Sequence, residues 1–235
     1  MKLAVIPARG GSKRIPRKNI KLFGGRPMIS WSIQAALDSG CFDKVIVSTD
    51  DQEIAEVARE WGAETPFVRP ASLADDHTGT TAVISHAATW AIQAGWAPSH
   101  VCCIYATAPL LDAKYLADAL TRLEAAQCDF VFSATSYAFP VQRAIALESD
   151  GAVRMLQPDQ FNVRSQDLQA AFHDAGQFYW GTVQAWLSGR PIFGTTSRIV
   201  QLPRYRVQDI DDIEDWESAE ILHAALQSRQ RLALS

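Results

Sequence analysis

The 235-residue sequence predicts an α/β fold with a doubly wound, mostly parallel sheet. Three observations support this prediction. Short apolar runs alternate with segments of helical period along the first half of the chain. One of these runs, residues 101–105, is apolar throughout, as in a strand that is covered on both faces. A basic loop with adjacent glycines directly follows the first run, at the end of a strand where sheets of this class form their sites.

The alternating elements follow one another in chain order. β-Branched and other apolar residues predict strands at residues 3–7, 45–49, 101–105 and 130–135. The spacing of apolar residues predicts helices at residues 27–37, 51–61, 80–94 and 115–126. Pro27 suits the first turn of its helix, because that position needs no backbone N–H donor. This order favours a single α/β domain of residues 1–235, a length that can bury a sizeable core.

The pattern changes after Ser136. Turn signals and short mixed segments without a clear period fill residues 137–175, which we interpret as an inserted subdomain. Regular structure is expected to resume at residues 177–186 and again at 199–202. The chain then ends in a helix, and the apolar residues on its predicted buried face are Ile213, Trp216, Ala219, Leu222 and Leu226.

Charge is distributed unevenly along the chain. The net charge is −4, yet eight Lys or Arg residues precede the first acidic residue, Asp38. No aromatic residue precedes Phe23, whereas surfaces that bind single-stranded nucleic acid need aromatic side chains for stacking. A polyanionic small molecule bound at one site is therefore a better interpretation than a nucleic acid.

Composition and cysteine use predict a cytoplasmic protein without membrane contact. The sequence is 48% hydrophobic, but no run approaches the roughly 20 apolar residues that would span a bilayer. The apolar stretch at the N-terminus is too short for a signal peptide. The four cysteines form no C-x-x-C pair and have no metal-ligand spacing with the histidines, so we expect no zinc site.

The strongest chemical signal is the basic loop itself, residues 7–19, with the sequence PARGGSKRIPRKN. Gly10 and Gly11 allow a tight turn in which backbone N–H groups approach phosphate oxygens. The ten positions 9–18 contain five basic residues, which are Arg9, Lys13, Arg14, Arg17 and Lys18. The pattern is neither G-x-G-x-x-G nor G-x-x-x-x-G-K-[ST], so neither of those phosphate loops is expected. A solvated basic turn is the alternative, but glycines combined with this charge favour a phosphate site.

A second candidate site is the acidic segment at Asp209 and Asp211. In an extended chain the two Asp side chains point to the same side, because side chains alternate. Two converging carboxylates suit Mg²⁺ that bridges to a substrate phosphate. The alternative is acidic capping of the helix that follows, which Asp212 or Asp215 could provide. The spacing alone does not separate these two interpretations.

At the basic loop the chain resembles the CMP-sialic-acid synthetase family, the cytidylyltransferases of sialic-type acidic sugars. The residues that match the family signature ARxxSKxxPxKN are Ala8, Arg9, Ser12, Lys13, Pro16, Lys18 and Asn19. The likeness continues through residues 42–51, 69–76 and 209–211, and so extends over nearly the whole chain. It implies a Rossmann-like fold, CTP as the nucleotide substrate, Mg²⁺, and a homodimer built through the inserted subdomain.

The resemblance also implies roles for particular residues. Arg9, Lys18 and Asp211 are the expected catalytic residues, and Asp209 and Asp211 are the expected metal ligands. The expected nucleotide-binding residues are Ala8, Arg9, Gly10, Gly11, Ser12, Lys13, Lys18, Asn19, Arg69, Thr80 and Tyr105. The reaction that the family implies is attack of the sugar's anomeric hydroxyl on the α-phosphate of CTP, with release of pyrophosphate.

Three segments depart from the common sialic acid pattern and resemble the pseudaminic acid branch of the family. They are YATAP at 105–109, FPVQRA at 139–144 and DAGQFYWG at 174–181. The expected sugar-binding residues are Thr107, Gln142, Arg143, Arg164, Gln177 and Tyr179. Arg143 and Arg164 are candidates for the sugar carboxylate, because a guanidinium offers a bidentate fork, and an ordinary surface role is the alternative for each.

Two alternatives to this function stay open at this point. The same reaction on N-acetylneuraminic or legionaminic acid keeps the class of enzyme and changes the sugar. A catalytically silent protein that senses a nucleotide through the basic loop belongs to another class. The presence of both the Arg9–Lys18 loop and the Asp209–Asp211 pair favours an enzyme.

Overall fold

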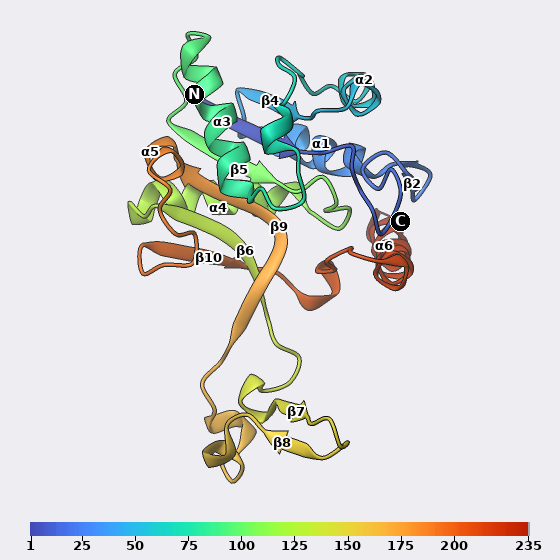
Figure 1. Ribbon diagram of the computed structural model, residues 1–235, viewed down its shortest axis with the longest axis vertical. Helices are drawn as coiled ribbons and strands as arrows, with labels where there is room; N and C mark the ends of the chain where they lie inside the picture. The colour runs from blue at the N-terminus through green and yellow to red at the C-terminus, as the bar shows by residue number, and fades with distance from the viewer. Residues whose placement is uncertain (235) are drawn as a thin grey trace.

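A six-stranded sheet forms the centre of the molecule in the computed structural model, which describes residues 1–234. Figure 1 shows this sheet between helices, with a small lobe projecting from one end. The strands of the sheet are β1 (Lys2–Pro7), β4 (Lys44–Ser48), β5 (His100–Ile104), β6 (Phe130–Ser136), β9 (Phe172–Thr182) and β10 (Ser197–Gln201). Their order across the sheet is β10-β6-β9-β5-β1-β4.

The direction of the strands confirms the predicted fold class and adds one unexpected feature. β1 pairs in parallel with β4 and β5, and β10 pairs in parallel with β6. β9 runs antiparallel between β5 and β6, so it joins the two parallel parts of the sheet. It begins at Phe172, so the last residues of the expected insert already belong to the central sheet.

The helices agree closely with the predicted ranges. They are α1 (Met28–Asp38), α2 (Gln52–Glu60), α3 (Thr80–Gln93), α4 (Ala113–Ala126), α5 (Val183–Leu187) and α6 (Ile213–Leu234). Aspartates define two of the starts, since Asp51 accepts a hydrogen bond from the backbone N of Ile54 and Asp112 accepts one from that of Lys114. Short 3₁₀ helices lie at Ala71–Leu73, Val141–Arg143, Pro158–Gln160, Ser165–Asp167 and Arg204–Arg206. None of the helices within residues 1–234 is long and apolar enough to cross a membrane.

The core lies on both faces of the sheet, as the alternation of side chains along β1 requires. Ala4 and Ile6 point to one face and pack with side chains of α1, α2 and α4. Leu3 and Val5 point to the other face and pack with side chains of α3 and α5. Because both faces are covered, these strands are apolar at consecutive positions, which is the pattern that identified them in the sequence.

The C-terminal helix closes the molecule against the basic loop. Trp216 and Ala219 of α6 pack with Ile15 of that loop, with Met28 and with Phe23, which lies in the short antiparallel pair β2 (Leu22–Phe23) and β3 (Arg26–Pro27). Among the residues predicted for its buried face, Ile213 is exposed, because it is the first residue of the helix and precedes this contact. The packing holds residues 209–211 beside the loop.

The insert is a lobe that projects from the sheet between β6 and β9 (Figure 1). Its regular part is the antiparallel pair β7 (Ile145–Leu147) and β8 (Val153–Met155). Large apolar side chains of the lobe are exposed, and they are Phe139, Ile145, Leu147, Val153, Leu156 and Phe161. A two-stranded pair has little stability of its own in water, so this apolar surface lacks the cover that the central sheet has.

A bulge interrupts β9 where it passes β6. Phe132 of β6 pairs with Tyr179, but Ala134, only two residues further, pairs with Asp174. The intervening residues of β9 therefore bend out of the ladder, and Gly176 adopts a left-handed φ of 62° there. Five residue steps along β9 thus match two along β6, and this brings the side chain of Asp174 within hydrogen-bonding distance of Tyr179.

Candidate active site

A cavity of about 290 Å³ lies beyond the carboxyl ends of β1 and β5. Its walls come from the basic loop, from the start of α3, from the residues after β5 and from Asp211 before α6. The lining residues are Pro7, Arg9, Ser12, Lys13, Arg14, Ile15, Lys18, Asn19, Arg69, Thr78, Thr80, Val83, Tyr105, Ala106, Thr107 and Asp211. A site in this position is what a doubly wound sheet provides.

The structure brings together most of the residues expected to bind a nucleotide. Those that line the cavity are Arg9, Ser12, Lys13, Lys18, Asn19, Arg69, Thr80 and Tyr105. Ala8, Gly10 and Gly11 belong to the same loop but do not line the cavity. Thr107 and Asp211, expected to contact the sugar and the metal, lie in the same lining. The basic loop and the acidic segment, far apart in sequence, thus meet at one site.

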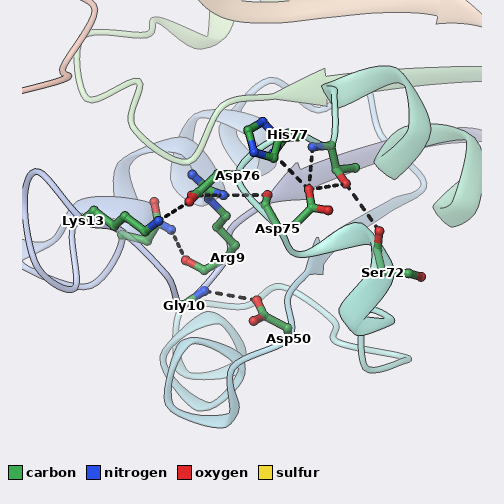
Figure 2. A network of polar contacts seen from close by, with 10 residues as sticks. Arg9, Gly10, Lys13, Asp50, Ser72, Asp75, Asp76 and His77 are labelled. Atoms are coloured by element: carbon green, nitrogen blue, oxygen red, sulfur yellow. Dashed lines mark hydrogen bonds and ion pairs between the residues drawn. The ribbon is translucent and has the colours of Figure 1, made fainter.

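Acidic residues hold the basic loop in place, as Figure 2 shows. Arg9 donates to the backbone oxygen of Asp75 at 2.6 Å and pairs with Asp76 at 2.7 Å, and Lys13 also pairs with Asp76. The backbone N of Gly10 donates to Asp50 at 3.1 Å. A Cβ on Gly10 would lie 2.7 Å from a carboxylate oxygen of Asp51, so any larger residue here would have to displace the Asp51 side chain.

Two neighbouring basic residues of the loop have different environments. Arg17 has a left-handed φ of 57° and points away from the cavity, where it forms ion pairs with Asp51 and Glu53. The hydrogen bonds that Arg17 donates to Asp51 raise the pKa of Arg17, and the same contact lowers the pKa of Asp51. Arg17 therefore anchors the loop to the start of α2, and its neighbour Lys18 is the one that faces the site.

Lys18 is largely enclosed and lies next to the acidic segment. Its Nζ donates to the backbone oxygen of Ile210 at 2.5 Å and lies 3.9 Å from Asp211. Burial lowers the pKa of Lys18, against the opposing charges of Asp211 and Asp209. Arg14 pairs with the same carboxylate of Asp211 at 2.8 Å. An incoming phosphate would share these two cations with Asp211.

Asp209 and Asp211 fit a divalent cation by their chemistry. The pKa of Asp209 is raised from its ordinary value, first by loss of solvation and then by the charge of Asp211, although the residue as a whole is exposed. A positive charge between the two carboxylates would remove that repulsion. No group of three His, Cys, Asp or Glu within residues 1–234 is placed to hold a metal ion. One or two protein carboxylates together with substrate phosphates are sufficient for Mg²⁺.

Arg69 is a buried cation in the cavity wall. Its side chain donates to the hydroxyl of Ser48 at 3.1 Å and to the backbone oxygen of the same residue. Burial lowers the pKa of Arg69 to about 10, which leaves the guanidinium charged at neutral pH. Asn19, also buried, donates to the backbone oxygen of Arg9 at 3.0 Å and so fixes the turn of the loop.

The residues expected to bind the sugar fall into two other places. Gln142, Arg143 and Arg164 lie in the projecting lobe, outside the lining of the cavity. Their side chains contact other residues of the lobe. Gln142 donates to the backbone oxygen of Gln169 at 2.8 Å, and Arg143 donates to that of Val163 at 2.9 Å. Arg164 donates to the carboxylate of Asp167 at 2.7 Å.

The other two expected residues are buried in β9. Gln177 donates to the backbone oxygen of Arg206, and Tyr179 donates to Asp174. The Tyr179 ring lies 5.3 Å from the ring of Tyr105, which itself lines the cavity. These two residues therefore support the wall of the cavity from behind.

Sequence reasoning missed several residues that shape the site. Asp76 is the last residue of the 69–76 segment that resembles the family, so a signal for it was present, and the structure shows that it pairs with Arg9 and Lys13. Arg14 and Thr78 line the cavity without having been assigned a role. Asp174 begins the DAGQFYWG segment, but its contact with Tyr179 depends on the bulge, for which no local sequence signal exists.

A doubly wound sheet with a cluster of cations and a carboxylate around one cavity beyond its strand ends is an arrangement suited to a nucleotidyltransferase. The comparison with known families specifies which one. The chain belongs to the cytidylyltransferase family, whose model, described as "Cytidylyltransferase", matches residues 3–210. Enzymes of this kind generally use a divalent metal ion.

Known relatives match almost the whole chain. It is 49% identical over 221 residues to the pseudaminic acid cytidylyltransferase of Campylobacter jejuni, covering 94% of this chain and 95% of that one. It is 34% identical to N-acylneuraminate cytidylyltransferase B of Danio rerio, covering 92% of this chain and 50% of that one. A solved structure of CMP:2-keto-3-deoxy-manno-octonic acid synthetase with CTP superposes on this chain with a TM-score of 0.69 at 15% sequence identity. The match covers 95% of this chain and 98% of that one, so the two proteins share the fold.

Proposed function

We propose that this protein transfers CMP from CTP to the anomeric hydroxyl of pseudaminic acid and releases pyrophosphate. The observation that carries the reaction is the convergence of Arg9, Lys13, Lys18 and Asp211 on one cavity at the ends of β1 and β5. The choice of sugar is supported by the 49% identity to an enzyme named for pseudaminic acid, over nearly the full length of both chains.

The proposed chemistry is an in-line displacement. The oxygen of the sugar hydroxyl forms a bond to the α-phosphorus as the bond to pyrophosphate breaks, and charge on the phosphate oxygens must be neutralised. Arg9, Lys13 and Lys18 supply positive charge to the triphosphate. Asp209 and Asp211 would hold Mg²⁺, which as a Lewis acid polarises a phosphoryl oxygen when bound.

The remaining nucleotide contacts follow from the chemistry of the lining. Backbone groups of residues 8–12 and the side chains of Ser12 and Asn19 are proposed to surround the phosphates. Cytosine offers two hydrogen-bond acceptors beside its exocyclic amino donor, and the fixed guanidinium of Arg69 supplies donors to match them. Thr80 and Tyr105 form the part of the wall next to α3 and complete the proposed base site.

We further propose that two copies of the chain form a homodimer through residues 137–175. The exposed apolar side chains of the lobe support this, because such a surface in a stable protein is usually covered by a partner. Gln142, Arg143 and Arg164 do not line the cavity of their own chain, so their proposed contacts with the sugar need a second copy. The four free cysteines are compatible with the reducing cytoplasm, which is the compartment we propose.

A substitution in the lobe tests the dimer. We expect Leu147→Lys to convert a dimer into a monomer, because Leu147 is 76% exposed on β7 and a lysine there would carry charge into the proposed interface. Light scattering after size-exclusion chromatography measures the mass. Ile221→Lys is the matched control, since Ile221 is 71% exposed but lies on α6. A Leu147→Lys protein that stays dimeric, or an unmodified protein that is monomeric, contradicts the proposal.

Pyrophosphate release with CTP and a panel of acidic sugars tests the function. We expect a large preference for pseudaminic over N-acetylneuraminic acid, because polar groups of the site would be left unpaired by the wrong stereoisomer. Equal or reversed preference would leave the assignment as a cytidylyltransferase in place and would overturn the choice of pseudaminic acid as its sugar. Binding of CTP without release on any sugar would instead support the silent nucleotide-binding alternative.

A further inference from the structure

The carboxylate of Asp215 holds the segment that carries Asp209 and Asp211. Its Oδ2 atom accepts hydrogen bonds from the backbone N of Asp211 at 2.9 Å and from that of Asp212 at 3.2 Å. Its Oδ1 atom accepts one from the side-chain amide of Gln208 at 3.0 Å. Three donors of this segment thus meet on one carboxylate in the first turn of α6.

Helix capping accounts for only one of these three bonds. Asp212 and Asp215 form a reciprocal capping pair, because the Asp212 carboxylate accepts a hydrogen bond from the backbone N of Asp215 at 3.0 Å. In such a pair, the carboxylate on the helix needs to reach only the backbone N–H of the capping residue. Here the same oxygen lies closer to the backbone N of Asp211, which precedes the cap and belongs to the site.

The peptide unit between Ile210 and Asp211 is bound at both of its ends. Its N–H donates to Asp215, and its carbonyl oxygen accepts a hydrogen bond from Nζ of Lys18 at 2.5 Å. A peptide unit is planar, so hydrogen bonds at its two ends fix its tilt. The side chain of Ile210 adds a third constraint, because it is buried in the core beside Trp216.

The tilt of this peptide unit sets the direction in which the Asp211 side chain leaves the backbone and enters the cavity lining. The Asp211 side chain is 46% exposed, and its ion-pair partners are Arg14 and Lys18. A bound phosphate would attract both of these cations. The direction of Asp211 then depends on its backbone, and an incoming phosphate does not compete for the bonds that Asp215 accepts from the segment.

We propose that Asp215 is a positioning residue for the metal site, which directs Asp211 toward a divalent cation by fixing the peptide unit before it. The inference rests on the proposed function, in which Asp209 and Asp211 hold Mg²⁺. Groups that orient metal ligands from outside the coordination sphere typically change metal affinity by roughly 10- to 100-fold.

Two substitutions separate the hydrogen bonds of Asp215 from its charge. Asp215→Ala removes both. Asp215→Asn removes the charge but keeps a side-chain oxygen that can accept hydrogen bonds from the backbone N atoms of Asp211 and Asp212. We expect Asp215→Ala to weaken metal binding roughly 10-fold or more. Asp215→Asn should stay within about 3-fold of the unmodified protein, because a charge that does not touch the ion contributes little.

Mn²⁺ is the probe, with CTP present and the sugar absent so that no turnover occurs. Its binding is measured from the enhanced relaxation of water protons around a protein-bound Mn²⁺ complex. Calorimetry with CTP in the absence of a metal ion should give the same dissociation constant for the unmodified protein and both variants. A change confined to the metal titration therefore reports on the metal site.

Asp212→Ala is the matched control for the capping pair. Asp212 is exposed and adjacent to Asp211, but its carboxylate accepts its hydrogen bond from within α6. Loss of either member of the pair should lower the melting temperature. Mn²⁺ binding by Asp212→Ala should nevertheless stay within about 3-fold of the unmodified protein. If Asp215→Ala does not fold, Asp215→Glu replaces it, because Glu preserves the cap but its extra methylene displaces the oxygens from Asp211.

The possible results distinguish this inference from the proposed function. Equal losses of Mn²⁺ binding in Asp215→Ala and Asp215→Asn would mean that only charge matters, and the inference would be wrong. Equal losses in Asp215→Ala and Asp212→Ala would mean a purely structural role and would also overturn it, as would Mn²⁺ binding that Asp211→Asn leaves unchanged. If the expected losses are found but no acidic sugar is turned over, the inference holds and the proposed function fails.

Discussion

Lys18→Ala is expected to lower the rate of pyrophosphate release by roughly 100-fold or more while the protein keeps its fold. Lys18 lies in the cavity, 3.9 Å from Asp211, and it is the more enclosed of the two loop cations beside that carboxylate, the other being Arg14. Burial lowers the pKa of Lys18, which means that the charged form is held at some energetic cost in the free protein. Removal of this ammonium should therefore weaken the neutralisation of phosphate charge far more than it weakens the stability of the fold.

Lys21→Ala provides the control for this prediction. Lys21 belongs to the same basic segment, but it is exposed and lies 4.7 Å above the ring of Trp216, outside the cavity lining. Steady-state rates at saturating CTP, together with melting curves, compare the two variants. A Lys18→Ala enzyme as active as Lys21→Ala would show that Lys18 does not act on the phosphates.

Asp211→Asn should have the second large effect, a rise in the Mg²⁺ concentration needed for activity. An amide oxygen carries no charge for the ion, and the change also leaves Arg14 and Lys18 without their anionic partner. Asp209→Asn should act in the same direction. Because the pKa of Asp209 is raised, protons should compete with the metal at a higher pH than at an ordinary aspartate, so activity at limiting Mg²⁺ should weaken earlier on acidification.

Asp212→Asn is the matched control, because Asp212 has the capping role that is the alternative for its neighbours. Its carboxylate accepts a hydrogen bond from the backbone N of Asp215 at 3.0 Å, at the start of α6. This variant should lose thermal stability with an unchanged Mg²⁺ requirement. If titrations of activity against Mg²⁺ gave the same result for Asp211→Asn, the metal site would have to lie elsewhere.

The sequence predicted most of the fold because periodicity and burial act locally. The strands and helices up to Ser136 agree with their predicted ranges to within about two residues, since each is marked by its own apolar pattern. The direction of β9 was not predictable in the same way. A buried run has the same pattern in either direction, and only the neighbouring strands β5 and β6 decide how it pairs.

Some parts of the site could be predicted from the sequence and others could not, again because only some have a local signal. The basic loop and Asp211 were identified as site elements, and the structure places them at one cavity. Composition could not separate Lys18 from Arg17, because the left-handed turn at Arg17 decides which one faces the site. The sugar-binding assignments in the lobe stay predictions, since that part of the chain does not reach its own cavity.

The pairing of β6 with β9 makes the entire lobe the connection of one long hairpin. The entropic cost of closing a loop grows slowly with its length, by only about 0.6 kcal/mol for each doubling. Residues 137–171 could therefore lengthen, shorten or change in shape with little effect on the stability of the sheet. A chain of this topology can vary the surface it offers to a partner while the strands that carry its cavity stay in register.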